Sequence, residues 1–290
     1  MKQLLILKQS NLFLFFIIYI YIQNEVMEFE QIPCNVIDSP TDYRDWIYTS
    51  KEDIPLSLDY RPQLCPIRNQ GKVGSCFAMS SCCMKEFQER KDYNFQDYFS
   101  PKFFYSQRQN IRDDNLHNDE GMFSRDVMKL LKNTGVCYES SCPYTKVEEP
   151  FKYGPLFEEA KKHTIRSYAR VKDRSSLCRA LVDNGICLIT FPVYHKGPEM
   201  WNPLHKGDVK QGGHAMAVVG YDMVKQHFII RNSWGTSFGD KGYCYFKFED
   251  WGKHREVWTT VDNESHIRRR RDPILPFKIR KVKQNCCTIL

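Results

Sequence analysis

Three short segments, far apart in the chain, carry the side chains best suited to chemistry. The first reads NQGKVGSCFA and contains Cys76, the second reads GGHA and contains His214, and the third reads RNSWG and contains Asn232. A thiol becomes a usable nucleophile when a neighbouring base holds it as a thiolate and a third group orients that base. The three residues supply a thiol, a base and an orienting amide in that order. The sequence therefore predicts attack by Cys76 on a carbonyl carbon.

The order and spacing of these segments resemble those of the papain-like cysteine proteases, the cathepsin-like family. His214 lies 138 residues after Cys76, and Asn232 lies 156 residues after it; the family has its His and Asn roughly 130–150 residues downstream of the Cys. The resemblance covers roughly residues 53–262, from the LDYR that opens the domain to the YCYFKF strand near its end. It implies a cysteine-type endopeptidase with protein or peptide substrates, an acyl-enzyme intermediate, and no cofactor or metal.

The resemblance also assigns roles to single residues. Cys76 at the start of a helix would be held as thiolate by the helix dipole and by His214. Asn232 would orient the imidazole, and Trp234 would shield their hydrogen bond from water. The oxyanion hole would combine the side chain of Gln70 with the backbone N–H of Cys76, and one such donor contributes about 3 kcal/mol to transition-state stabilisation.

Further residues are expected to support this site. Gly74 would allow close approach of the substrate and an unusual backbone angle, and Ser75 precedes the nucleophile. The family commonly selects an apolar residue two places before the cut, and we expect Met122 and Ala215 to line that pocket. The alternative for Met122 is an ordinary core position.

Hydrophobic periodicity predicts an α+β chain with helices first and antiparallel strands after them, and the resemblance implies the papain-like two-lobed fold. A helical lobe would span about residues 53–165 and an antiparallel, β-barrel-like lobe about residues 166–262, with the active-site cleft between them. Residues 23–52 are too few for the long inhibitory propeptide of the family, and form a short linker or residual pro-segment. The expected helices cover residues 75–91, 124–132 and 174–183, and the expected strands cover residues 186–191, 215–219, 228–231 and 243–248.

The distribution of charged residues further narrows the class of protein to which this chain could belong. Residues 266–290 hold eight Lys or Arg and one Asp, so the +7 net charge lies there, and the preceding 265 residues carry 34 basic and 34 acidic groups. A neutral body argues against nucleic-acid binding, and we expect a monomer.

Twelve cysteines would ordinarily suggest a secreted disulfide framework, but Val73 stands where the family carries a Cys. Cys137 and Cys142 are near enough in sequence to bridge or to remain free. Buried free thiols are expected at Cys82, Cys83, Cys178, Cys187 and Cys244.

Both ends of the chain carry localisation signals that exclude each other. Residues 1–22 contain an apolar run that suits a targeting or anchor segment. The basic tail, residues 263–290, ends in CCTIL, a motif that suits lipidation of Cys287 with Cys286 as a second site. Prenylation takes place in the cytosol, whereas a signal segment would deliver the tail to the lumen. We therefore expect a membrane surface as a partner, through one end or the other, in the secretory pathway or on the cytosolic face.

Other functions stay open at this point. The fold would also suit a catalytically inactive peptide-binding module, or a membrane-associated protein whose termini recruit partners. A peptide ligase or an exopeptidase variant would use the same acyl-enzyme intermediate. The complete set of Gln70, Cys76, His214 and Asn232 favours the endopeptidase.

Overall fold

The computed structural model describes residues 31–48, 53–93, 95–110, 121–146 and 153–262. Within these residues there is no helix long and apolar enough to cross a membrane. The predicted targeting segment 1–22, the basic tail 263–290 and the two predicted lipidation sites in that tail lie outside the described residues. Membrane association and localisation therefore stay predictions from the sequence.

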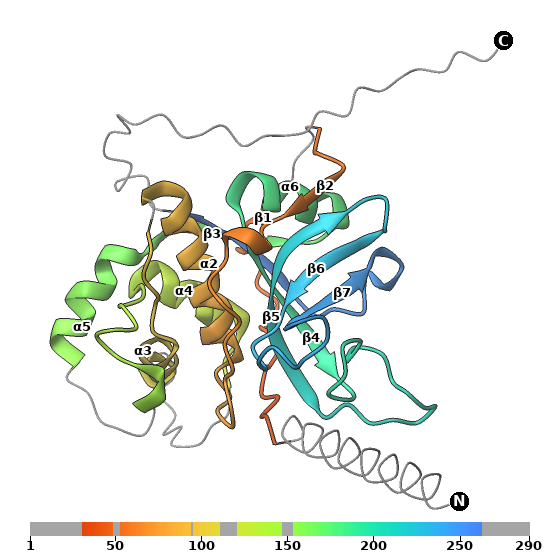
Figure 1. The fold of residues 1–290 in the computed structure, drawn as a ribbon, viewed down its shortest axis with the longest axis horizontal. Helices are drawn as coiled ribbons and strands as arrows, with labels where there is room; N and C mark the ends of the chain where they lie inside the picture. Colours follow the sequence, from red (N-terminus) through yellow and green to blue (C-terminus); the bar gives the residue numbers. More distant parts are fainter. Residues whose placement is uncertain (1–30, 49–52, 94, 111–120, 147–152, 263–290) are drawn as a thin grey trace, which may run out of the picture.

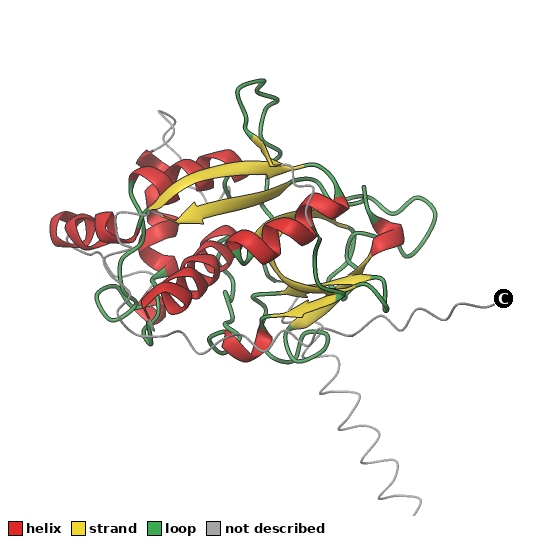
Figure 2. Ribbon diagram, turned by 90° about the horizontal axis from the view of Figure 1, so that it is seen from above, coloured by secondary structure: helices red, strands yellow, loops and turns green. Residues whose placement is uncertain are grey.

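Helices and strands occupy different sides of the molecule, which confirms the α+β class (Figure 1). The helical side contains α2 (Cys76–Tyr93), α3 (Pro101–Ser106), α4 (Ser124–Asn133) and α5 (Tyr153–Ala160). Figure 2, seen from above, shows most of the helices on the left and the loops and shorter strands on the right. The short 3-10 turns are η1 (Arg61–Gln63), η2 (Gln107–Asn110), η3 (Tyr144–Lys146), η4 (Lys161–His163) and η5 (Phe248–Asp250).

The sheet forms the other lobe and is antiparallel except for the parallel pair β1–β3. The sheet is open. The β-barrel-like lobe expected from the resemblance therefore describes this sheet as more closed than it is. β2 (Ser57–Asp59) pairs with β5 outside the main path, and α6 (Arg174–Asn184) packs against β4, β5 and β8. Along the main path the strands are β1 (Ile47–Tyr48), β3 (Ile165–Val171), β8 (Val257–Asp262), β4 (Cys187–Val193), β5 (Gly212–Asp222), β6 (His227–Arg231) and β7 (Tyr243–Lys247).

α2 is buried on every side over most of its length, not along one face as its periodicity suggests. All of Cys76–Glu89 is buried, because α2 packs against α3 and α4 as well as against β5. Buried charged side chains along it are paired: Lys85 contacts Glu89 at 2.9 Å, and Glu86 pairs with Arg68 at 2.7 Å. Pairing of this kind offsets the cost of burying charge.

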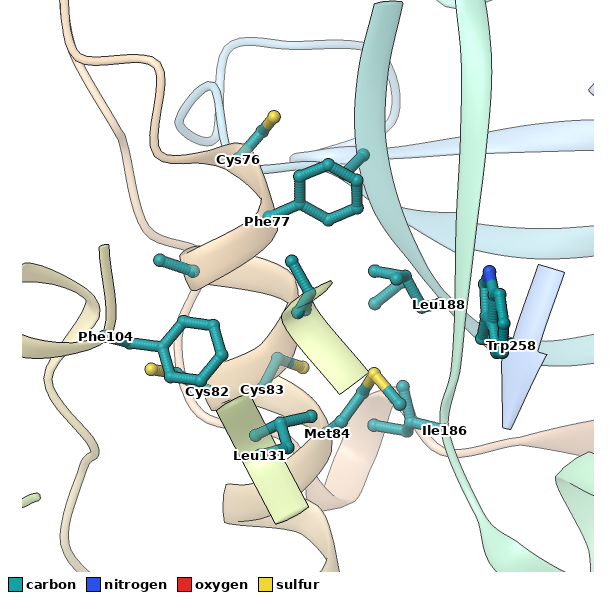
Figure 3. Packing of buried hydrophobic residues seen from close by; sticks show 14 of the residues in the cluster. Cys76, Phe77, Cys82, Cys83, Met84, Phe104, Leu131, Ile186, Leu188 and Trp258 are labelled. Carbon is teal, nitrogen blue, oxygen red and sulfur yellow. The ribbon is translucent and has the colours of Figure 1, made fainter. Parts of the chain in front are cut away.

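The principal core lies where the two lobes meet. One cluster of buried hydrophobic side chains joins α2 and α4 to β5 and β8, and includes Phe77, Met84, Leu131 and Trp258. Figure 3 shows these side chains packed beneath the start of α2, with the sulfur of Cys76 pointing away from them. The first residue of α2 is therefore held by the core while its thiol points away from the labelled side chains.

Candidate active site

The candidate nucleophile, Cys76, is the first residue of α2. A helix N-terminus presents backbone N–H groups without partners in the helix, and these favour a negative charge on a nearby group. One turn further on, the hydroxyl of Ser80 donates to the carbonyl of Ala215 at 3.3 Å. This contact places the first turn of α2 against β5, one residue beyond the candidate base His214. The side chains of Cys76 and His214 are both buried, with 1% and 0% of their surface exposed.

The candidate base is fixed by its neighbours on the sheet side. Nε2 of His214 donates to Oδ1 of Asn232 at 2.7 Å, and the backbone N–H of Ser233 donates to the same oxygen at 2.8 Å. An oxygen that accepts two N–H groups is the carbonyl end of the amide, so Nε2 carries the proton. Nδ1 is then the basic nitrogen, and it is buried without a hydrogen-bond partner among the described residues. The indole of Trp234 lies 4.5 Å from the imidazole, centroid to centroid.

Burial determines the charge of this imidazole. Desolvation lowers the pKa of His214 from 6.5 to about 3, the hydrogen bond to Asn232 acts in the opposite direction, and the charge of Lys196 lowers the pKa further. His214 is therefore neutral at neutral pH in this structure. A thiolate–imidazolium pair needs the protonated ring, and the burial of His214 opposes that charge.

The loop before Cys76 is joined to the loop after β6. The backbone N–H of Gln70 donates to the carbonyl of Ser233 at 2.8 Å, and the Ser233 hydroxyl donates to Oε1 of Gln70 at 2.7 Å. Nε2 of Gln70 donates to the carbonyl of Val73 at 2.9 Å. An amide nitrogen carries two N–H groups, so the second is available for a substrate oxyanion. In this loop the backbone adopts a left-handed angle at Gly71 (φ +59°). Gly74, which the sequence singled out, is buried.

Two residues that the sequence did not single out support this loop. The hydroxyl of Tyr144 donates to the carbonyl of Gln70 at 2.8 Å and lies 2.7 Å from the hydroxyl of Ser75. Ser233 orients Gln70, as described above. Ser233 lies inside the RNSWG motif, so the motif itself could have indicated its role. Tyr144 lies 68 residues after Cys76 in the chain, and no local pattern indicates its role.

Two glycines after the motif let the chain turn beneath the site. A Cβ at Gly239 (φ +53°) would lie 2.3 Å from the carbonyl oxygen of Tyr243, and one at Gly242 (φ +91°) would lie 2.7 Å from the side chain of Ile67. The carbonyl of Gly242 accepts the backbone N–H of Asn232 at 2.9 Å. The close approach that only glycine permits therefore anchors Asn232.

The predicted pocket residues are buried and their surroundings are filled. Met122 and Ala215 are 3% and 0% exposed and belong to one hydrophobic cluster with Val36. Val36 comes from the N-terminal part of the chain, outside the domain that the resemblance covers. Met122 and Ala215 thus belong to the core that also contains Val36.

Residues 34–38, here called the covering segment, lie along the boundary between the lobes. On the sheet side the N–H of Gly213 donates to the carbonyl of Cys34 at 2.9 Å, and the N–H of Val36 donates to the carbonyl of Gly213 at 3.1 Å. On the helical side the N–H of Ile37 donates to the carbonyl of Met122 at 3.4 Å. Gly213 adjoins His214, so the covering segment crosses the boundary next to the candidate base.

Burial makes most of the cysteines other than Cys76 poor nucleophiles, whereas Cys34 is partly exposed and its sulfur accepts from Nζ of Lys196 at 2.7 Å. None of the ten described cysteines forms a disulfide, and nine of them are buried. Burial raises the pKa of the Cys178 and Cys187 thiols to about 12 and raises that of Cys244 further. The buried free thiols expected from the sequence are confirmed, and Cys137 and Cys142 are unbridged.

Comparison with known proteins assigns the family. Residues 54–260 match the model of the papain family of cysteine proteases, and the chain belongs to this family. It is 31% identical over 216 residues to cathepsin K of Mus musculus, covering 69% of this chain and 62% of that protein. It is 27% identical over 201 residues to an uncharacterized peptidase C1-like protein of Acanthamoeba polyphaga mimivirus, covering 63% of this chain and 64% of that protein.

Solved structures support the same assignment. Xylellain, a cysteine protease from Xylella fastidiosa, superposes with a TM-score of 0.68 at 28% identity, covering 80% of this chain and 97% of xylellain. The family and the fold predicted from the sequence are therefore confirmed. The chain spans less than two thirds of the length of the curated relatives named above.

Proposed function

We propose that this chain is a cysteine-type endopeptidase that the covering segment holds in a closed form. The observation that carries the proposal is the imidazole of His214, which is bonded through Nε2 to Asn232 and packs against the tilted ring of Trp234, while Nδ1 is free to act as a base. Membership of the papain family supports the reaction class. The closed form is supported by the burial of Cys76 and His214 and by the backbone bonds that hold the covering segment to Gly213, next to His214.

Catalysis would begin when the covering segment leaves and water reaches His214. Nδ1 then takes the proton of Cys76, and the thiolate sulfur bonds to the peptide carbonyl carbon while the carbonyl electrons move to its oxygen. The Gln70 amide and the Cys76 N–H would stabilise that oxyanion. As the C–N bond breaks, His214 gives its proton to the leaving amine. Water, deprotonated by Nδ1, then attacks the thioester and releases the acid and the Cys76 thiol.

Covalent labelling of Cys76 tests the proposal. We compare the full chain with an opened variant that carries Val36→Lys and Asp38→Lys, because a lysine in the apolar cluster and another beside Arg255 should expel the covering segment. An epoxide or vinyl-sulfone probe should label the opened variant at Cys76, found by peptide mass spectrometry, and the wild type at least tenfold more slowly. The Cys76→Ala and His214→Ala forms of the opened variant are the controls.

The products separate the remaining functions. Internal cleavage of a quenched peptide by the opened variant supports an endopeptidase, trimming from one end supports an exopeptidase, and transfer to an added amine supports a ligase. A folded opened variant that neither labels at Cys76 nor cleaves, but binds peptides, would replace the proposal with the inactive binding module.

A further inference from the structure

Arg255 lies beside the covering segment, and the groups that its side chain binds belong to that segment. Arg255 lies just before β8, and its backbone N–H donates to the carbonyl of Thr190 on β4 at 2.8 Å. Its guanidinium reaches Gly213, where a Cβ would lie 2.3 Å from Nη1. The side chain is 14% exposed. The backbone therefore fixes a largely buried cation beside the residue that precedes His214.

The contacts of this guanidinium are those of a carboxylate-binding site. Nη1 donates to the carbonyl of Val36 at 2.8 Å, while Nη2 and Nε lie 2.7 Å and 2.6 Å from the two carboxylate oxygens of Asp38. This is the bidentate pairing for which the planar guanidinium is suited. The acidic neighbour Glu256 is engaged elsewhere, because it pairs with Arg170 at 3.0 Å and accepts from the Ser39 hydroxyl at 3.0 Å.

Removal of the covering segment would leave this cation without its partner. In the opened form of the proposed function residues 34–38 move away, and Asp38 and the carbonyl of Val36, which bind Arg255, move with them. Glu256 is the acidic residue nearest to Arg255 in sequence among the described residues, and it is already paired with Arg170. A largely buried charge without a partner is costly, so a carboxylate supplied by a substrate would be bound strongly there.

We propose that Arg255 is a specificity-determining residue that binds the carboxylate of an Asp or Glu side chain of the peptide substrate. The inference rests on the proposed function and names its substrate class. Asp38 acts as the internal stand-in for that side chain, two residues from Val36, which fills the apolar cluster of Met122 and Ala215. The favoured substrate thus pairs an apolar residue with an acidic residue two positions away along the peptide. The carboxylate at a peptide's own C-terminus has the same chemistry, and the test separates the two sources.

The test uses the full-length opened variant, whose Asp38→Lys change removes the internal carboxylate. Capped, internally quenched peptides carry one valine and either Asp or its neutral isostere Asn two positions before or after it. We expect kcat/KM for one Asp peptide to exceed that of its Asn partner about tenfold, which corresponds to about 1.4 kcal/mol. Arg255→Gln should remove the preference, and Arg255→Glu should invert it in favour of Lys peptides. Lys253→Gln is the matched control, because Lys253 pairs with Asp250 of its own turn, and it should keep the preference.

A binding measurement keeps the inference independent of turnover and of the folding of the Arg255 variants. Fluorescence anisotropy with the Cys76→Ala form of the opened variant should give a lower Kd for the Asp peptide than for the Asn peptide. Equal Kd values and equal kcat/KM values would overturn the role of Arg255 while labelling of Cys76 still supports the peptidase. Preference only for an uncapped C-terminus would overturn side-chain recognition. Loss of Cys76 labelling alone would count against the proposed function and leave the Kd comparison to decide the role of Arg255.

Discussion

At the scale of single residues, the candidate site depends on the orientation of one imidazole. Oδ1 of Asn232 accepts from both His214 and the Ser233 N–H, so the amide is held in one orientation and fixes the tautomer of the ring. The backbone bond from Asn232 to Gly242 fixes the main chain that carries the amide, and Trp234 packs against the imidazole. The proton positions that the proposed reaction needs are thus determined by neighbours that do not react.

We expect Asn232→Ala in the opened variant to lower kcat about tenfold or more, with a much smaller change in KM. The imidazole would lose its orienting bond, and correct positioning of a general base is a large part of its effect. Steady-state kinetics with a quenched peptide measures the split. Asn184→Ala, which removes an amide bonded to Thr259 instead, should leave kcat within about twofold. A rise in KM with unchanged kcat would contradict the orienting role.

The charge of His214 should differ between the closed and opened forms. In the closed form burial holds the pKa of His214 at about 3, below its ordinary 6.5. The stability that His214 gives the closed form is therefore complete above about pH 6.5 and is lost as the pH falls toward 3, so acid favours opening. NMR of the imidazole Cε1–H should show no titration of His214 above pH 5 in the wild type, and a higher midpoint in the opened variant. One common midpoint would show that the covering segment does not control this ionisation.

At the scale of elements, the sequence predicted those whose pattern is local. The helix expected over residues 75–91 is α2, and the strands expected from residue 186 onward are β4 to β7, with ends displaced by a few residues. β1 has two residues and pairs with β3, more than a hundred residues away, so no local periodicity marks it. The position of the covering segment depends on Gly213 and Met122, which are distant in sequence, and was not predicted for that reason.

A buried ion pair anchors the chain just after the covering segment. The carboxylate of Asp45 accepts Nε and Nη2 of Arg125, on α4, at 2.8 Å and 2.7 Å, and both side chains are about 10% exposed or less. Removing one partner of a buried pair leaves the other uncompensated and costs about 3 kcal/mol. Asp45→Asn should therefore loosen the segment and raise the rate of Cys76 labelling in the otherwise wild-type chain at least tenfold.

The control for this change is Asp42→Asn. Asp42 pairs with Arg44, whose side chain is 76% exposed, and an exposed pair contributes little. Labelling of this variant should stay within about twofold of the wild type. Equal labelling of the Asp45 and Asp42 variants would show that the ion pair does not hold the covering segment in place.

At the scale of the whole molecule, the site exists only where the lobes meet. α2 supplies Cys76, β5 supplies His214 and the loop after β6 supplies Asn232, so the three come together through packing between lobes. The sequence predicted these residues because their motifs are local and their spacing resembles a known family. It gave no indication of Tyr144, Arg255 or the covering segment, whose roles depend on contacts that arise only after the lobes pack.

Arg231 links β6 to the loop that carries Gln70, and its removal tests whether this link serves the stability of the fold or the chemistry of the site. Its guanidinium is 6% exposed and donates to the carbonyls of Cys65 and Pro66 at 2.7 Å and 2.6 Å, at the start of the loop that carries Gln70. Two hydrogen bonds from a buried charge contribute about 3 kcal/mol, so Arg231→Met should lower Tm by roughly 6–12 °C for a domain of this size. Because the Gln70 loop would lose one of its anchors, kcat of the opened variant should also fall, while the His214–Asn232 bond persists in NMR. An unchanged kcat at the lowered Tm would show that Arg231 stabilises the fold without positioning the oxyanion hole.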